Sequence, residues 1–159
     1  MYRIGLGYDI HRLEVDRDLI IGGVKIPHVT GLVGHSDADV LIHAIIDAMF
    51  GALALGDIGT HFPDTDEKYK GISSILLLQH AYRLIQEEGY VINNLDCNII
   101  AQAPKMKPHI PAMQKELAKH LGVDVNLISI KAKTNEQMDA VGEKKAIEAN
   151  AVIMLRKKD

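Results

Sequence analysis

The chain has 159 residues, of which 47% are hydrophobic and 25% are charged, and its formal net charge is −3. These values are typical of one globular domain with a substantial core, so we expect residues 1–159 to form a single domain. The small negative charge argues against a general attraction to nucleic acid, and no window approaches the ~20 unbroken apolar residues of a membrane helix. We therefore expect neither nucleic acid nor a membrane as a partner.

Cysteine content and the first residues bear on cellular location. Cys97 is the only cysteine and cannot form an internal disulfide, which favours a reducing compartment. The opening MYRIGLGYD shows neither the apolar run of a signal peptide nor an Arg- and Ser-rich transit segment. We expect a cytoplasmic protein, or one of the plastid stroma if a transit peptide has been removed.

The first predicted elements are a strand and a hairpin. Residues 2–8 (YRIGLGY) have the pattern of a strand that ends in glycines. Residues 19–27 (LIIGGVKIP) place two apolar runs around Gly22 and Gly23, which is typical of a two-residue hairpin turn.

A long apolar helix and a polar loop follow the hairpin. The spacing predicts a helix in residues 35–56, with Ser36 as its N-cap and with Gly51 and Gly56 at its far end. This helix is apolar almost all round, which indicates burial on several sides. Residues 56–71 carry Gly, Pro and Asp throughout and predict a loop long enough to be functional.

The second half of the chain alternates helices with strands. The predicted helices are 72–89 and 112–122, the predicted strands are 91–102, 127–134 and 146–157, and a loop is predicted at 103–111. This interleaving predicts an α/β fold in which helices pack on one or both faces of a mixed sheet.

Asp9, His11 and His43 are candidate metal ligands. Asp9 and His11 are two residues apart, so an extended backbone would put both side chains on one face. His43 lies in the apolar helix, with Asp39 and Asp47 four residues away on either side. One carboxylate and two imidazoles suit zinc, or iron with open positions. Spacing alone favours an ordinary strand end and an ordinary helix histidine.

The loop at 56–71 offers the carboxylates Asp57, Asp64 and Asp66 among small residues. These groups could accept hydrogen bonds from the hydroxyls of a polyol or help to hold a hard cation. Asp and Gly are also the usual turn formers, and that interpretation prevails for the loop alone.

Two further segments could bind an anion or a second metal ion. In APKMKPHIP the prolines Pro104 and Pro108 stiffen a loop that carries Lys105 and Lys107, although an exposed basic turn is an equal alternative. In KAKTNEQ a strand is followed by Thr134 and Glu136, where a hydroxyl could donate to phosphate and a carboxylate could hold Mg²⁺. The P-loop, the dinucleotide-binding GxGxxG, HExxH and the GxSxG nucleophile elbow are all absent.

Read together, the motifs resemble one family. The segments IGLGYDIHRL, IIGGVKIP, GLVGHSDADVLIHAIIDAMFGALALGDIGTHFPDTD, IIAQAPKMKPHI and KAKTNE occur in this order and spacing in the 2-C-methyl-D-erythritol 2,4-cyclodiphosphate synthases. The resemblance covers residue 2 to about residue 136. It implies a homotrimer of subunits related to the ferredoxin-like α+β fold, with active sites at the subunit interfaces. It also implies cyclisation of 4-diphosphocytidyl-2-C-methyl-D-erythritol 2-phosphate with loss of CMP in non-mevalonate isoprenoid synthesis.

The resemblance also implies roles for individual residues. Asp9, His11 and His43 would bind one Zn²⁺ per subunit, and Glu136 a second divalent ion, Mg²⁺ or Mn²⁺. His35 and Thr134 would stabilise the transition state. The substrate would be contacted by Ser36, Asp57, Ile58, Gly59, Phe62, Pro63, Asp64, Thr65, Asp66, Ala101, Gln102, Ala103, Pro104, Lys105, Met106, Lys107, Lys133 and Asn135. Of these, Ala101 to Lys107 would hold the cytidine from a neighbouring subunit.

One segment departs from the family pattern. Where the family often has a Phe and an Arg along the trimer axis, this chain has Ala140 and Glu143. That cavity can bind an isoprenoid diphosphate in the family, and a glutamate there would repel one, unless Lys144 or Lys145 compensates. We therefore expect this ligand to bind poorly. A rise in thermal stability on adding an isoprenoid diphosphate would contradict this prediction.

Three alternatives to the synthase remain open from the sequence. A zinc-dependent phosphohydrolase would use water as the attacking group, which mass analysis of the product distinguishes. A non-catalytic trimeric cytidine-nucleotide-binding protein would bind CDP without turnover. A non-haem iron enzyme could use the same two histidines and carboxylate, and elemental analysis would separate zinc from iron.

Overall fold

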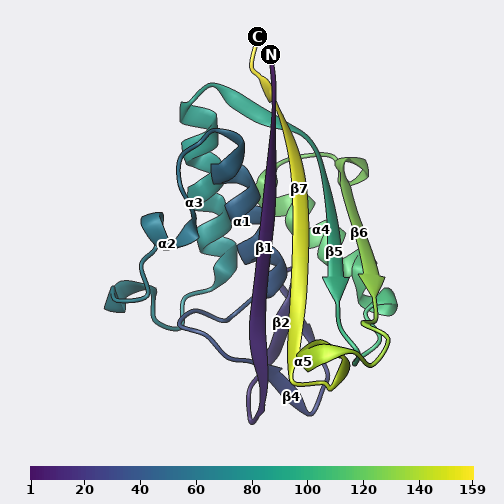
Figure 1. Cartoon of the computed structure of the whole chain (residues 1–159). Coiled ribbons are helices and arrows are strands. Elements are labelled where there is room, and N and C mark those ends of the chain that lie inside the picture. Colours follow the sequence, from purple (N-terminus) through teal and green to yellow (C-terminus); the bar gives the residue numbers. More distant parts are fainter.

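A computed structural model describes all residues, 1–159, and shows a mixed α/β architecture (Figure 1). The strands are β1 (Tyr2–Val15), β2 (Leu19–Ile21), β3 (Val24–Ile26), β4 (Thr30–Leu32), β5 (Tyr90–Ile100), β6 (Ile128–Lys133) and β7 (Ala146–Lys157). The helices are α1 (Val40–Ala52), α2 (Ile58–His61), α3 (Ser74–Glu87), α4 (Ile110–Leu121) and α5 (Asp139–Gly142). Short 3₁₀ turns lie at Glu67–Tyr69, Lys107–His109 and Val125–Leu127. No helix has the length and apolar character needed to cross a membrane.

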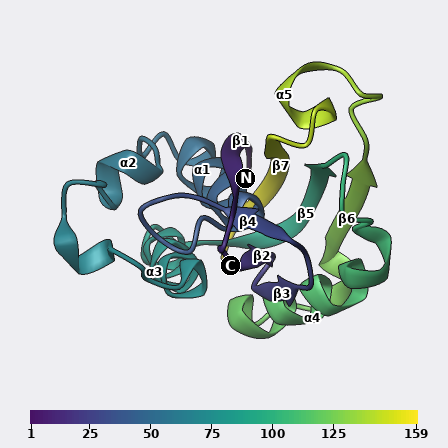
Figure 2. The same ribbon diagram turned by 90° about the horizontal axis from the view of Figure 1, so that it is seen from below.

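The predicted mixed sheet is confirmed. Five strands pair in the order β4-β1-β7-β5-β6, and β2 and β3 form a separate hairpin. Only β5 and β6 run parallel, while the other neighbours are antiparallel. Helices α1, α3 and α4 lie behind the sheet, on the same face (Figures 1 and 2). The core therefore sits between this face and α1, whose apolar side chains are almost all buried.

The first strand is longer than predicted and alternates along its length. It runs to Val15 because residues 2 to 12 pair without interruption with β7. Its even-numbered side chains, among them Ile4 and Leu6, face away from α1 and are 65% and 70% exposed. Gly5 and Gly7 face α1. The period of two then places Asp9 and His11 on that same side.

The missing side chain at Gly7 permits a close approach of β1 to α1. A Cβ at this position would overlap the carbonyl oxygen of Ala44. We expect Gly7→Ala to lower the free energy of unfolding by about 1–3 kcal/mol, because a helix backbone must move to make room. Urea denaturation measures the change. Gly51→Ala is the matched control, since the nearest atom to its Cβ is 3.8 Å away and it should stabilise α1 by up to about 1 kcal/mol.

The predicted hairpin is confirmed, but the predicted N-cap of α1 is wrong. Gly22 and Gly23 have φ values of 61° and 74°, as a turn with two left-handed residues requires. Helix α1 begins at Val40, and its N-cap is Asp39 rather than Ser36. Asp39 accepts from the amide of Ile42 and also from those of Gly22 and Gly23, at 2.9 and 2.7 Å. The hydrogen bonds from Gly22 and Gly23 connect the hairpin to the helix and favour Asp39 over Ser36 as the cap.

Other boundaries differ from the predictions by a few residues. The predicted loop at 56–71 contains α2 and a 3₁₀ turn, because Asp57 and Asp66 each cap a short helix. Helix α3 lies within the predicted 72–89, and α4 begins two residues earlier than predicted. Strand β4 and helix α5 were not predicted from the sequence, since each is too short to show a period.

Candidate metal and phosphate site

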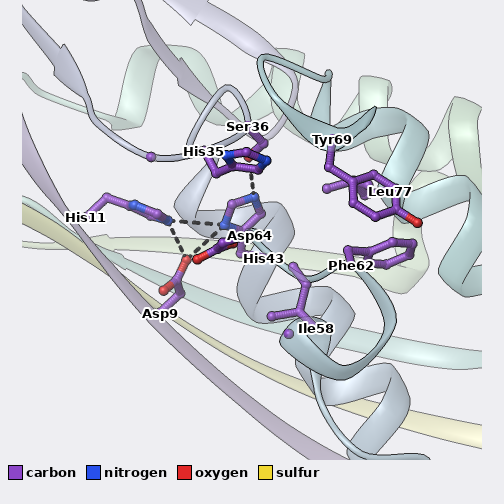
Figure 3. Close-up of a pocket in the computed structure, with 12 residues that line it drawn as sticks. Asp9, His11, His35, Ser36, His43, Ile58, Phe62, Asp64, Tyr69 and Leu77 are labelled. Atoms are coloured by element: carbon purple, nitrogen blue, oxygen red, sulfur yellow. Dashed lines mark hydrogen bonds and ion pairs between the residues drawn. The ribbon is translucent and has the colours of Figure 1, made fainter. Parts of the chain in front are cut away.

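Asp9, His11 and His43 converge on one point between β1 and α1 (Figure 3). The Nε2 atom of His11 lies 2.8 Å from Oδ2 of Asp9, and Nδ1 of His43 lies 3.1 Å from the same oxygen. The two ring nitrogens are 3.1 Å apart. Because β1 supplies two of these groups on one face and α1 packs against that face, the fold brings together residues that are 32 to 34 positions apart.

The protonation of His11 shows that this group of atoms suits a cation. Its Nδ1 lies 2.8 Å from the carbonyl oxygen of Val33, which can only accept a hydrogen bond, so Nδ1 carries a proton. Neutral His11 therefore presents a lone pair at Nε2 toward the carboxylate of Asp9. Facing lone pairs at this distance need a proton or a metal ion among them, so the donor set fits a divalent ion.

The pKa values of Asp9 and His11 shift in opposite directions. Burial disfavours the charged form of Asp9, but the adjacent imidazoles of His11 and His43, when they carry a proton toward it, outweigh burial and lower its pKa to about 2. Burial also disfavours the imidazolium of His11, but the hydrogen bond and the charge of Asp9 prevail and raise its pKa. Asp9 therefore stays ionised, and its negative charge stabilises positive charge at the neighbouring position. This is the electrostatic environment that a bound cation requires.

The cluster opens into a cavity of about 240 Å³ (Figure 3). The predicted site residues in its lining are Asp9, His11, His35, Ser36, His43, Ile58, Gly59, Phe62 and Asp64. Gly34, Tyr69 and Leu77 complete the lining and were not predicted. Tyr69 packs edge-on against Phe62, with ring centroids 5.4 Å apart, so one wall is apolar and the opposite wall carries the histidines.

The aspartates of the loop after α1 divide into two groups. Asp64 lines the cavity. Asp57 and Asp66 cap α2 and a 3₁₀ turn instead, and they are absent from the lining, as are Pro63 and Thr65. The Nε2–H of His35 donates to the carbonyl oxygen of Asp66 at 3.1 Å, which fixes the ring beside the cavity.

Asp39 and Asp47, which lie four residues away from His43 on either side, bind backbone amides. Asp39 caps α1, and Asp47 accepts from the amide of Ile58 at 2.8 Å. The second contact holds the start of α2 against α1 and so positions Ile58 and Gly59 at the cavity. Burial raises the pKa of Asp47.

The other predicted site residues gather in a second cavity, of about 190 Å³. Its lining consists of Ala101, Gln102, Pro104, Lys105, Met106, Lys107, Ala132, Lys133 and Thr134, at the ends of β5 and β6. Ala103, Asn135 and Glu136 follow the same strand ends outside the lining. Glu136 has a left-handed backbone with φ of 50°, and its amide donates to Thr134 Oγ1 at 3.4 Å.

The two cavities share no residue and lie far apart in the chain. The first sits beside β1 and α2, and the second lies at the far edge of the sheet, with β7 between β1 and β5. Both ribbon views place α2 and β6 on opposite sides of the molecule (Figures 1 and 2). The fold of the single chain therefore does not bring His43 and Thr134 together.

The segment around Glu143 lies next to β7. Glu143 forms an ion pair with Lys145, which partly neutralises its charge within the subunit. Lys144 has a left-handed backbone with φ of 63°.

Comparison with known proteins relates the whole chain to one family. The YgbB family model matches residues 2–156. The 2-C-methyl-D-erythritol 2,4-cyclodiphosphate synthase of Clostridioides difficile strain 630 is 58% identical over 153 residues, which are 96% of this chain and 95% of that protein.

Solved structures show the same relationship. The bifunctional IspDF of Campylobacter jejuni superposes with a TM-score of 0.96 at 39% identity, and the match covers 100% of this chain and 43% of that longer one. A CDP complex of IspF from Plasmodium falciparum superposes with a TM-score of 0.88 at 41% identity, covering 99% of this chain and 97% of that one. The chain therefore belongs to the YgbB family, together with the 2-C-methyl-D-erythritol 2,4-cyclodiphosphate synthases.

Proposed function

We propose that this protein converts 4-diphosphocytidyl-2-C-methyl-D-erythritol 2-phosphate into 2-C-methyl-D-erythritol 2,4-cyclodiphosphate and CMP. The observation that carries the proposal is the convergence of Asp9, His11 and His43 in the wall of a cavity that His35, Ser36 and Asp64 also line. Membership of the family supports it, since relatives 58–60% identical carry the name of this synthase.

The chemistry requires no protein nucleophile. An oxygen of the 2-phosphate, ionised at neutral pH, attacks the β-phosphorus, the bond from that phosphorus to the bridging oxygen breaks, and CMP leaves with the electron pair. Water is neither consumed nor added. In phosphoryl transfer a protein mainly orients the groups and stabilises charge, and ring closure needs both ends of the substrate held near each other.

The residues of the first cavity are suited to those tasks. Asp9, His11 and His43 would hold a divalent ion, zinc in our proposal, which when bound neutralises charge on the phosphate oxygens as a Lewis acid. Ser36 offers a hydroxyl donor beside it, His35 would contact the phosphates from the cavity wall, and Asp64 would accept from an erythritol hydroxyl. Ile58, Gly59, Phe62 and the neighbouring loop residues would enclose the erythritol.

The residues of the second cavity would bind the nucleotide half of the substrate. Lys105, Lys107 and Lys133 offer positive charge to phosphates, and Thr134 offers a hydroxyl donor. Glu136 would hold Mg²⁺ or Mn²⁺, which would supply positive charge to the phosphates of the CDP group. The CDP bound in the relative from Plasmodium falciparum supports a cytidine nucleotide as the ligand.

A homotrimer would join these two cavities into one site. The face of the sheet opposite α1 exposes apolar side chains along β1 and β7, namely Tyr2, Ile4, Leu6, Tyr8, Ile10 and Val152. Such a contiguous apolar surface is typical of a subunit interface. Closed cyclic symmetry would place the first cavity of one subunit against the second cavity of its neighbour.

We also propose a single domain and a cytoplasmic location. One cluster of 39 buried residues supports a single domain over residues 1–159. The bacterial relatives support a cytoplasmic location.

Product analysis tests the proposed reaction. The protein is incubated with the substrate in ¹⁸O-labelled water, with and without a chelator, and the products are analysed by mass. We expect unlabelled cyclodiphosphate and CMP only in the metal-replete sample. Labelled phosphate products would indicate a phosphohydrolase, and CDP binding without turnover would indicate a nucleotide-binding protein. Elemental analysis of the purified protein distinguishes zinc from iron.

Metal affinity should fall as the pH is lowered. A metal ion requires the neutral form of His11, whose pKa is raised above the ordinary 6.5 by Asp9. Below that pKa each bound ion displaces a proton, so we expect the affinity to drop by up to about tenfold per pH unit. Above it the affinity should level off. Chelator competition between about pH 5.5 and about pH 8.5 measures this, and a constant affinity across that range would contradict the assignment.

A further inference from the structure

The second ring nitrogen of His43 is also engaged, on the side away from Asp9. Its Nε2 lies 2.9 Å from the hydroxyl oxygen of Ser74 and 3.1 Å from that of Ser36. Ser74 opens α3 and is fully buried, so no water competes for this contact. Neither the site predictions nor the cavity lining included Ser74.

The hydrogen bonds of Ser74 fix the direction of its contact with His43. The hydroxyl of Ser74 donates to Oδ1 of Asp37, and the amide of Ser74 donates to Oδ2 of Asp37 at 3.0 Å. An ionised carboxylate can only accept, so the single hydroxyl hydrogen of Ser74 points to Asp37. The oxygen of Ser74 can then only accept from His43, which requires a proton on Nε2.

Ser36 does not impose this constraint. Its oxygen accepts from the amide of Ala38 at 3.2 Å, while its own hydrogen is free to point toward or away from His43. Ser36 is therefore compatible with either tautomer of the ring. Only the pair Ser74 and Asp37 selects the tautomer in which Nε2 is protonated.

We propose that Asp37 and Ser74 are positioning residues for the metal site, because they hold His43 with its proton on Nε2 and its lone pair on Nδ1. The inference rests on the proposed metal-binding role of His43. His11 is held in a corresponding way, since the carbonyl of Val33 takes the Nδ1 proton and leaves Nε2 free. In its neutral form each imidazole thus directs its lone pair to the position of the ion. Residues that hydrogen-bond to a metal ligand without contacting the ion typically contribute a factor of about 10–100 in metal affinity.

Two measurements test the inference without using turnover. Long-range ¹H–¹⁵N NMR of the metal-free wild-type protein should show His43 with its proton on Nε2. Ser74→Ala should produce a mixture of tautomers and weaken Zn²⁺ binding by about 10–100-fold in chelator competition. Asp37→Asn should act in the same direction, because an amide NH₂ cannot accept from the donors around it. Ser73→Ala is the matched control: Ser73 is the N-cap of α3, and its side chain makes no capping hydrogen bond.

The outcomes separate this inference from the proposed function. A wild-type His43 protonated on Nδ1, or wild-type Zn²⁺ affinity in Ser74→Ala, would overturn the inference and leave the metal site in place. A wild-type protein that binds no Zn²⁺ would overturn both. Thermal unfolding of the metal-free variants shows whether a loss of affinity reflects a loss of folding, and in that case the NMR result on the wild-type protein decides.

Discussion

His43→Ala should abolish stoichiometric Zn²⁺ binding and lower the rate of CMP release by about 10³-fold or more. The substitution removes one of three protein ligands, and an ion held by Asp9 and His11 alone is easily lost. Metal-ion neutralisation of a phosphoryl transition state is worth several kcal/mol, and about 4 kcal/mol corresponds to about 10³ in rate. Metal content by elemental analysis and CMP release by chromatography measure the two effects.

The matched control is His120→Ala, which makes the same substitution on α4 far from the cluster. His120 pairs with Glu116 and Gln79 and contacts no site residue, so zinc content and rate should remain at the wild-type level. A His43→Ala protein that retains bound zinc would contradict the ligand assignment. One that loses zinc yet keeps its rate would show that the ion is structural.

The sequence predicts an element of this fold well where neighbouring residues determine its bounds, and poorly where contacts with distant segments determine them. The turn at Gly22 and Gly23 follows from residue type, since both positions require a left-handed backbone that glycine adopts freely. The N-cap of α1 does not, because Ser36, Asp37 and Asp39 are all good caps by residue type. Asp39 prevails through hydrogen bonds to the hairpin, which no local pattern reveals.

The same distinction applies to the site. The spacing of Asp9 and His11 predicts that they share a face, and the structure confirms this. Their proximity to His43 depends on the packing of α1 against the glycines of β1, so it followed only from the family resemblance. Ser74 and Asp37 were missed because a serine that begins a helix and an aspartate before one are ordinary capping residues. Their role emerges from the direction of hydrogen bonds between segments 37 residues apart.

If the protein forms the proposed homotrimer and each site uses two subunits, mixed trimers of two inactive variants should recover activity. His43→Ala disables the first cavity, and Thr134→Val removes a hydroxyl from the second while keeping its shape. Removal of one donor to the transition state typically costs about 10²–10³ in rate. Each variant alone should therefore be nearly inactive. Co-expressed in equal amounts, they should reach about a quarter of the wild-type rate per site, since half of the first cavities are intact and half of those meet an intact second cavity.

The fraction recovered distinguishes a shared site from a site within one subunit. If His43 and Thr134 acted in the same subunit, every subunit of the mixture would carry one defect, and no arrangement of the trimer could restore activity. Two differently tagged chains allow mixed trimers to be isolated and their rates compared with the single variants. Recovery is expected here because the two cavities share no residue and lie at opposite sides of the sheet. In the proposed homotrimer, a substrate that must contact both cavities would do so where two subunits meet.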